Sequence, residues 1–279
     1  MFTEFFRRTW SKTPRPAADR SRPKPACRAR FEHLEDRRLL SGDVVLHWNQ
    51  ITLDAIRQVK PNPLVGSRDL AIEQVAVFDA VNSIDRSFTP YFAQVHASRG
   101  ASMDAAAAQA AHDTLVALFP TQTSTFDAAL AAGLVGIPAG RARQGIAVGH
   151  DVAQQILTLR STDGSNAVVP YTPGTKPGDW QPTPPANLPA LAPQWASVTP
   201  WAMTSGSQFR PPKQPELNSA EYATAFNEVK DLGGDGTTTP SARTADQTQI
   251  ALFWKDAAGT SYAFGHWNEI AATASVSGR

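Results

Sequence analysis

The sequence predicts an all-α protein in which a helical bundle is followed by an irregular segment rich in proline and tryptophan. Apolar residues recur at spacings of three and four through most of 44–160, as on one face of a helix. Prolines are then concentrated between Pro170 and Pro200, where no period survives. With 279 residues, 42% of them hydrophobic and 18% charged, the chain can bury a sizeable core.

The first 42 residues are expected to form a separate tail. They carry an excess of Lys and Arg, whereas the rest of the chain carries an excess of Asp and Glu, so the net charge is only +1. Prolines interrupt this basic segment, which has no helical or strand period, and we expect it to be disordered or removed as a targeting segment. Basic clusters also bind phosphates. Because nothing downstream supplies a basic face, we expect no nucleic acid partner.

The end of this tail has two interpretations. Residues 31–41, Phe-Glu-His-Leu-Glu-Asp-Arg-Arg-Leu-Leu-Ser, resemble the LEPR-x-LL-type motif near the start of many exported or surface-associated bacterial proteins, with Asp36 where that motif usually has Pro. The alternative is a short amphipathic turn in a charged tail. Cys27 is the single cysteine, so the chain allows no internal disulfide and no thiolate metal cluster. Cysteine usage therefore leaves export and cytoplasm equally open.

Five helices are expected within a bundle that spans 43–160. Prolines, glycines and serine N-caps mark their ends. The expected spans are Trp48 to Val59, Asp69 to Ile84 with Ser67 as N-cap, Ser102 to Phe119, Phe126 to Val135, and Ala139 to Leu159. The second helix is apolar nearly all round, which places it in the middle of the bundle. Short loops between these helices make a bundle the economical architecture.

Residues 161–217 are expected to form a strap along the bundle. Trp180, Trp195 and Trp201 are interleaved with its prolines. Since a structureless linker is poor in Trp, we expect an irregular but ordered segment whose aromatic side chains are buried. The alternative is a flexible linker that binds a partner through its Pro-rich stretch.

A helical pattern returns in 218–279. One helix is expected from Ser219 to the Gly233-Gly234 pair, with aromatic and aliphatic residues on one face. A second is expected from Thr244 to Lys255, and a third from about Trp267 to the end of the sequence. No stretch of the chain approaches the roughly 20 apolar residues that a membrane-spanning helix needs, so we expect a soluble protein.

The residues themselves assign no catalytic, cofactor-binding or metal-binding site. Glu73 and Asp79 share a helix but lie six residues apart, so they point to different sides and cannot act as a carboxylate pair. We expect Asp79 and Asn82, at i and i+3, to form a buried hydrogen-bonded pair that fixes helix packing. His112-Asp113 and His150-Asp151 fall on separate helices with no second His at i+3 or i+4, so we expect solvated or capping histidines.

Loop motifs with a known chemistry are also missing from the sequence. There is no Gly-x-Ser-x-Gly elbow, no Gly-x-Gly-x-x-Gly turn and no phosphate-binding Gly-rich loop with Lys. The loop from Asp235 to Thr239 is too short and too poor in carboxylates to hold calcium.

An ordered series of strings nevertheless resembles the early helices of vanadium-dependent haloperoxidase-like proteins, which belong to the type 2 phosphatidic acid phosphatase (PAP2) superfamily. The series covers roughly 44–279. It comprises Trp48-Asn49, residues 71–84 (Ala-Ile-Glu-Gln-Val-Ala-Val-Phe-Asp-Ala-Val-Asn-Ser-Ile), Gln208-Phe209-Arg210-Pro211-Pro212, Tyr222 with 226–230, Arg243-Thr244 with Phe253-Trp254, and 267–271. The resemblance implies two stacked helical bundles, with the chemistry in the second.

The family holds vanadate, or phosphate in the phosphatases, with Lys/Arg side chains, backbone N–H groups and a histidine. These come from Lys-x6-Arg-Pro, Pro-Ser-Gly-His and Ser-Arg-x5-His motifs. Arg210-Pro211 has Met203 where the Lys belongs, and Ser277-Gly278-Arg279 lacks the flanking Pro and His. We therefore expect the front portion of such a protein, a truncated form without vanadate or any other cofactor of its own.

Three functional hypotheses follow. The first is the N-terminal part of a haloperoxidase-like protein, whose intact relatives oxidise halide with hydrogen peroxide, with this chain itself inactive. Its expected partner is the missing C-terminal bundle, or a second copy, through an exposed apolar face that includes Trp254, Trp267 and Ile270. The second is an exported, non-catalytic interaction or scaffold domain. The third is a fragment of a PAP2-type phosphatase.

Overall fold

The computed structural model describes residues 35–277, with side chains described from Val44 to Val276. The regular elements among these residues are all helices, and the β-structure there is limited to one isolated bridge between Ala258 and Thr260. Most of the basic tail expected over 1–42, with Cys27, lies outside the described residues, as do Gly278 and Arg279. The prediction of an all-α fold is confirmed.

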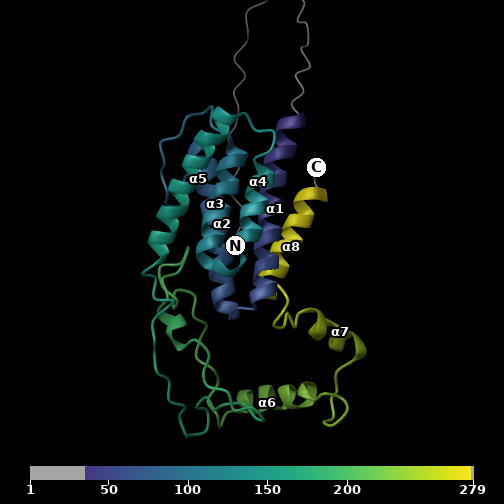
Figure 1. Cartoon of the computed structure of the whole chain (residues 1–279). Coiled ribbons are helices and arrows are strands. Elements are labelled where there is room, and N and C mark those ends of the chain that lie inside the picture. Colours follow the sequence, from purple (N-terminus) through teal and green to yellow (C-terminus); the bar gives the residue numbers. More distant parts are fainter. Residues whose placement is uncertain (1–34, 278–279) are drawn as a thin grey trace, which may run out of the picture.

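Five antiparallel helices and a returning sixth make up the bundle in Figure 1. They are α1 (Glu35–Val59), α2 (Pro63–Asp85), α3 (Met103–Leu118), α4 (Thr123–Gly133), α5 (Ala139–Arg160) and α8 (Tyr262–Ser277). A 3-10 turn, η1 (Pro120–Gln122), precedes α4. Helix α2 packs against α1, α3, α5 and α8, so the prediction that this helix lies within the bundle is confirmed.

The expected starts of α1 and α2 were wrong. Helix α1 begins at Glu35, so it includes Glu35–Gly42, which were expected to lack structure. Helix α2 begins at Pro63, because the Asn62 side chain accepts a hydrogen bond from the Leu64 N–H and proline is favoured in the first turn. Ser67 does not cap α2: it lies within the helix, and its hydroxyl donates to the Leu64 carbonyl at 2.8 Å.

Helices α3 and α5 approach each other closely because small residues line their contact. The Ala-rich face of α3 is fully buried, and Gly145 and Gly149 of α5 lie against its backbone. A Cβ added at Gly149 would lie 2.4 Å from the Ala106 carbonyl oxygen. The expected Ser102 cap of α3 is confirmed, since its hydroxyl accepts from the Ala105 N–H at 3.2 Å.

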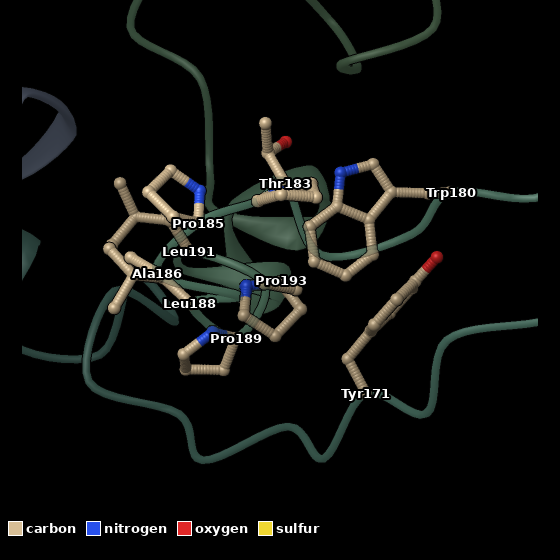
Figure 2. A pocket seen from close by; sticks show the side chains of 11 residues that line it. Tyr171, Trp180, Thr183, Pro185, Ala186, Leu188, Pro189, Leu191 and Pro193 are labelled. Atoms are coloured by element: carbon tan, nitrogen blue, oxygen red, sulfur yellow. The ribbon is translucent and has the colours of Figure 1, made fainter.

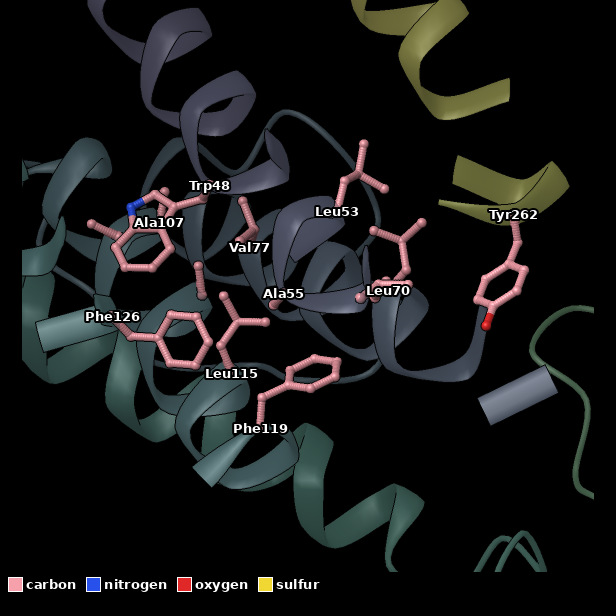
Figure 3. Packing of buried hydrophobic residues seen from close by; sticks show 13 residues of the cluster. Trp48, Leu53, Ala55, Leu70, Val77, Ala107, Leu115, Phe119, Phe126 and Tyr262 are labelled. Carbon is pink, nitrogen blue, oxygen red and sulfur yellow. The ribbon is translucent and has the colours of Figure 1, made fainter. Parts of the chain in front are cut away.

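The core between α1, α2, α3 and α4 is built around large side chains. Figure 3 shows the rings of Trp48, Phe119 and Phe126 packed with aliphatic residues from facing helices. Trp48 and Phe126 are almost fully buried, and burial of side chains of this size contributes roughly 2–3 kcal/mol each. Phe126 is the one buried residue of α4, so it anchors that helix.

The segment between α5 and α6 is irregular apart from the 3-10 helix η2 (Pro193–Ser197). The expectation of buried aromatic side chains was wrong for Trp180, which is 41% exposed, while Trp195 and Trp201 are half-buried. Trp201 contacts the bundle: the Arg160 guanidinium at the end of α5 lies 4.2 Å from the centre of its ring.

Helices α6 (Ala220–Gly233) and α7 (Ala245–Phe253) lie apart from the bundle in Figure 1. Their starts follow the expected caps, Ser219 and Thr244, the latter in a reciprocal capping box with Gln247. Neither helix buries any residue. We call residues 220–254 the arm.

Helix α8 returns the chain to the bundle beside α1. The Tyr262 hydroxyl donates to the Pro61 carbonyl at 2.6 Å, and Arg57 pairs with Glu269. Helix α8 starts earlier than expected, at Tyr262 and not near Trp267. Within the described residues, no helix has both the length and the hydropathy needed to cross a membrane.

Candidate functional site

Asp79 and Asn82 hold a loop in place. The buried Asp79 carboxylate accepts three backbone hydrogen bonds, from the N–H groups of Tyr91, Phe92 and Ala93, at 2.7–2.9 Å. The Asn82 side chain both donates to and accepts from the backbone of Phe88, at 2.8 and 3.0 Å. The expected hydrogen bond between Asp79 and Asn82 is replaced by these contacts, because each side chain satisfies the loop that follows α2. Both residues are structural.

Glu73 is a fully buried acid between α1 and α2. Its Oε2 accepts from the Gln74 side chain at 2.7 Å, and its Oε1 has no partner among the described residues. Burial raises the pKa of this carboxyl to about 8, an effect that the nearby polar side chains of Gln74 and Thr52 only partly offset. Glu73 is therefore mainly protonated at neutral pH. Since no part of it is exposed, it is not open to a substrate.

Two arginines and two aspartates form a buried ionic network that anchors the strap. Arg68 of α2 donates to Asp163 at 2.7 Å, and Arg160 pairs with the same carboxylate at 2.8 Å. Arg160 also donates to the Thr199 carbonyl at 2.8 Å. Burial raises the pKa of Asp69 to about 6 in spite of Arg68. Burial also acts to raise the pKa of Asp163, but hydrogen bonds from Arg68 and Ser165 outweigh it and lower that pKa.

A cluster of histidines and aspartates joins α3, α4 and α5. Asp113 accepts from His112 Nδ1 at 2.8 Å and from His150 Nδ1 at 2.7 Å, while His112 Nε2 lies 2.8 Å from Asp127 of α4. The expectation of solvated or capping histidines was thus wrong for His112, which is flanked by carboxylates on both nitrogens. A search for metal-binding pairs at i+3 or i+4 on one helix cannot find a cluster spread over three helices.

This cluster links helices and offers no vacant ligand set. Both nitrogens of His112 and both oxygens of Asp113 are committed to hydrogen bonds. No group of His, Cys, Asp and Glu among the described residues has an arrangement that could hold a metal ion. Through the contact between His112 and Asp127, the cluster holds α4, which has little buried surface, against α3.

The loop that begins at Asp235 is also satisfied internally. The carboxylate accepts from the backbone N–H groups of Thr237, Thr238 and Thr239, each at 2.8 Å. A hydrogen bond from the Thr238 hydroxyl and these N–H groups hold the pKa of Asp235 well below its usual range. A carboxylate engaged in this way stabilises the loop after α6 and is not arranged as a calcium ligand.

The residues present do not fit the oxyanion site that the family resemblance implies. Such a site needs several unpaired cationic side chains and N–H donors aimed at one point. Arg68 and Arg160 lie close together, but both are paired with Asp163. Arg210 and Met203 are exposed on the strap, whereas Arg68 is half-buried and Arg160 is buried.

No family model matches the sequence, and no curated protein matches it either. Among solved structures, the chain is similar to the crystal structure described as the first bacterial vanadium-dependent iodoperoxidase, with 21% sequence identity and a TM-score of 0.58. The similarity covers 80% of this chain and 55% of that chain, so the chain spans about half the length of the iodoperoxidase. The arrangement of α1–α8 is thus a haloperoxidase-like fold.

Proposed function

We propose that this chain supplies the non-catalytic helical bundle of a vanadium haloperoxidase-like protein. The observation that carries the proposal is the fold likeness to the iodoperoxidase, which extends over 80% of this chain. In intact relatives, the resemblance implies halide oxidation by hydrogen peroxide at a vanadate held by the second bundle. The chain described here acts as the support for that bundle and does not itself carry out the reaction.

The arrangement of charged residues supports a non-catalytic role for this bundle. Buried arginines are neutralised by Asp163, and His112 is held between Asp113 and Asp127. An oxyanion would have to displace these partners, and breaking a buried ion pair costs several kcal/mol.

The arm supports docking to a second helical body. Phe226 and Val229 of α6 and Leu252 and Phe253 of α7 are exposed, although helices with an apolar face normally bury it. As expected, Trp254, Trp267 and Ile270 are also exposed, at 43%, 59% and 41%. A second bundle packed on these side chains would remove this surface from water.

A turnover assay tests the proposal. The purified chain, incubated with vanadate, hydrogen peroxide and iodide or bromide, should oxidise neither halide above the rate of a protein-free control. An active vanadium haloperoxidase assayed in parallel shows that the conditions permit turnover. Halide oxidation that scales with chain concentration and requires vanadate would contradict the proposal.

A further inference from the structure

The strap contains an apolar pocket that none of the functions above uses. It lies within 171–193, between α5 and α6, and has a volume of about 880 Å³. Figure 2 shows Trp180 and Tyr171 on one side, facing Leu188, Leu191, Pro189 and Pro193 on the other. This volume falls within the range of about 300–1,000 Å³ typical of small-molecule sites.

The lining selects against a charged ligand. No Asp, Glu, Lys, Arg or His side chain contributes to the pocket wall. The rings of Tyr171 and Trp180 meet edge to face, with their centres 5.5 Å apart and an interplanar angle of 78°. In Figure 2 the Tyr171 hydroxyl points away from the proline wall, whereas the Trp180 indole nitrogen lies on the side of Thr183, so the lining is mainly ring faces and hydrocarbon with a few polar atoms. Offset or edge contacts with a further ring are favoured by such an arrangement.

The proline content of the wall selects against a peptide. Pro184, Pro185, Pro189 and Pro193 line the pocket, and proline has no backbone N–H to donate. The wall therefore offers few backbone N–H groups to the carbonyl groups of a bound polypeptide. A ligand without carbonyl groups needs no such donors.

We propose that this pocket binds a small, uncharged, planar apolar molecule, such as a substituted aromatic ring system. Its ring packs against Trp180 and Tyr171, and Leu188 and Leu191 close over it from the opposite wall. These leucines are 68% and 69% exposed in the structure, so a ligand there removes their surface from water. The proposal is independent of the supporting role proposed for the bundle.

Titration with N-phenyl-1-naphthylamine, a neutral fluorescent aromatic amine, tests the site in the full chain. Binding should be saturable at one molecule per chain, with energy transfer from tryptophan that falls when Trp180 is replaced by Phe. Leu188→Asp and Leu191→Asp place a carboxylate in the wall, and each should weaken binding at least tenfold. Both residues lie outside the bundle, so the helical circular dichroism signal should stay unchanged.

Two variants of matched chemistry serve as controls. Val168→Asp alters a side chain on the same strap that is 95% exposed and outside the pocket, and Leu252→Asp alters the exposed arm. Neither should change the affinity. Non-saturable binding, or an equal loss with Leu252→Asp, would mean that the probe binds exposed apolar surface in general and would overturn the proposal. A change in sedimentation with Leu188→Asp would show that a second chain covers the pocket, which would also overturn it.

Discussion

Glu73 illustrates how burial governs the behaviour of single residues in this bundle. It lies on α2 with one carboxyl oxygen unpartnered among the described residues, and the buried indole nitrogen of Trp48 on α1 also lacks a partner there. Unpaired buried polar atoms cost about 1–3 kcal/mol each, so this position works against stability. A buried acid can avoid part of the cost by staying protonated.

Glu73 should make the folded state less stable as pH rises. The unfolded chain loses this proton near the ordinary value of 4.5, whereas the folded chain keeps it up to about 8. Between these values the folded state binds more protons, so its contribution to the free energy of unfolding falls by about 1.4 kcal/mol per pH unit. Glu73→Gln keeps the shape of the protonated acid and should remove this slope, as measured by urea denaturation from pH 5 to 8.

The matched control for this measurement is Glu221→Gln, at an exposed position on α6. It should leave the difference between pH 5 and pH 8 as in the wild-type chain. Asp69 adds a similar but smaller dependence at lower pH, because burial raises its pKa to about 6. Equal pH slopes for wild type and Glu73→Gln would show that Glu73 ionises as an exposed acid does.

Among the helix contacts, the close approach of α3 and α5 depends on small residues, alanines of α3 and glycines of α5. Alanine normally stabilises a helix interior relative to glycine by about 1 kcal/mol. Gly149→Ala should nevertheless destabilise the protein by about 1–3 kcal/mol, because its Cβ would lie 2.4 Å from the Ala106 carbonyl oxygen, and backbone cannot move aside as a flexible side chain can. Thermal and urea unfolding both measure this loss.

Gly140→Ala, in the first turn of the same helix, is the control. Nothing lies within 4 Å of a Cβ built there, so the substitution should be neutral or slightly stabilising. A Gly149→Ala variant as stable as Gly140→Ala would mean that the two helices are further apart than described.

The sequence predicts the start of a helix well where a local hydrogen bond, such as that of an N-cap residue, determines it. The caps at Ser102, Ser219 and Thr244 involve hydrogen bonds three residues along the chain, so the sequence contains them. The expected start of α2, at Ser67, lies too late along the chain, because Asn62 followed by Pro63 already provides an N-cap and a favoured first residue.

The candidate site could be predicted less well, because its contacts join distant elements. The His112, Asp113, Asp127 and His150 cluster depends on how three helices are rotated about their axes, which spacing along one helix does not reveal. Likewise, the large apolar ring of Trp180 does not ensure its burial: the ring contacts Tyr171 of the same segment and is 41% exposed.

At the scale of the whole molecule, the exposed apolar side chains of the arm and α8 should cause self-association in the isolated chain. Trp267 and Ile270 lie one turn apart on α8, and Trp267 packs against Trp254 with ring centres 5.5 Å apart. The double variant Trp267→Glu, Ile270→Glu should shift the sedimentation profile toward monomer, because the charges oppose burial of this face.

Val135→Glu provides the comparison, since Val135 is 81% exposed but lies between α4 and α5, away from the arm. It should leave the self-association unchanged. A wild-type chain that is monomeric at all concentrations tested and melts in one cooperative step would contradict the docking role of this face.

The central claim is that the described bundle supports an oxyanion-binding bundle without binding the oxyanion itself. Vanadium-51 NMR of orthovanadate titrated with the purified chain tests this claim most directly, because bound vanadate broadens and shifts the signal whether or not turnover occurs. We expect a spectrum that matches vanadate with an equal concentration of an unrelated protein. A saturable loss of the free signal at one vanadate per chain would contradict it.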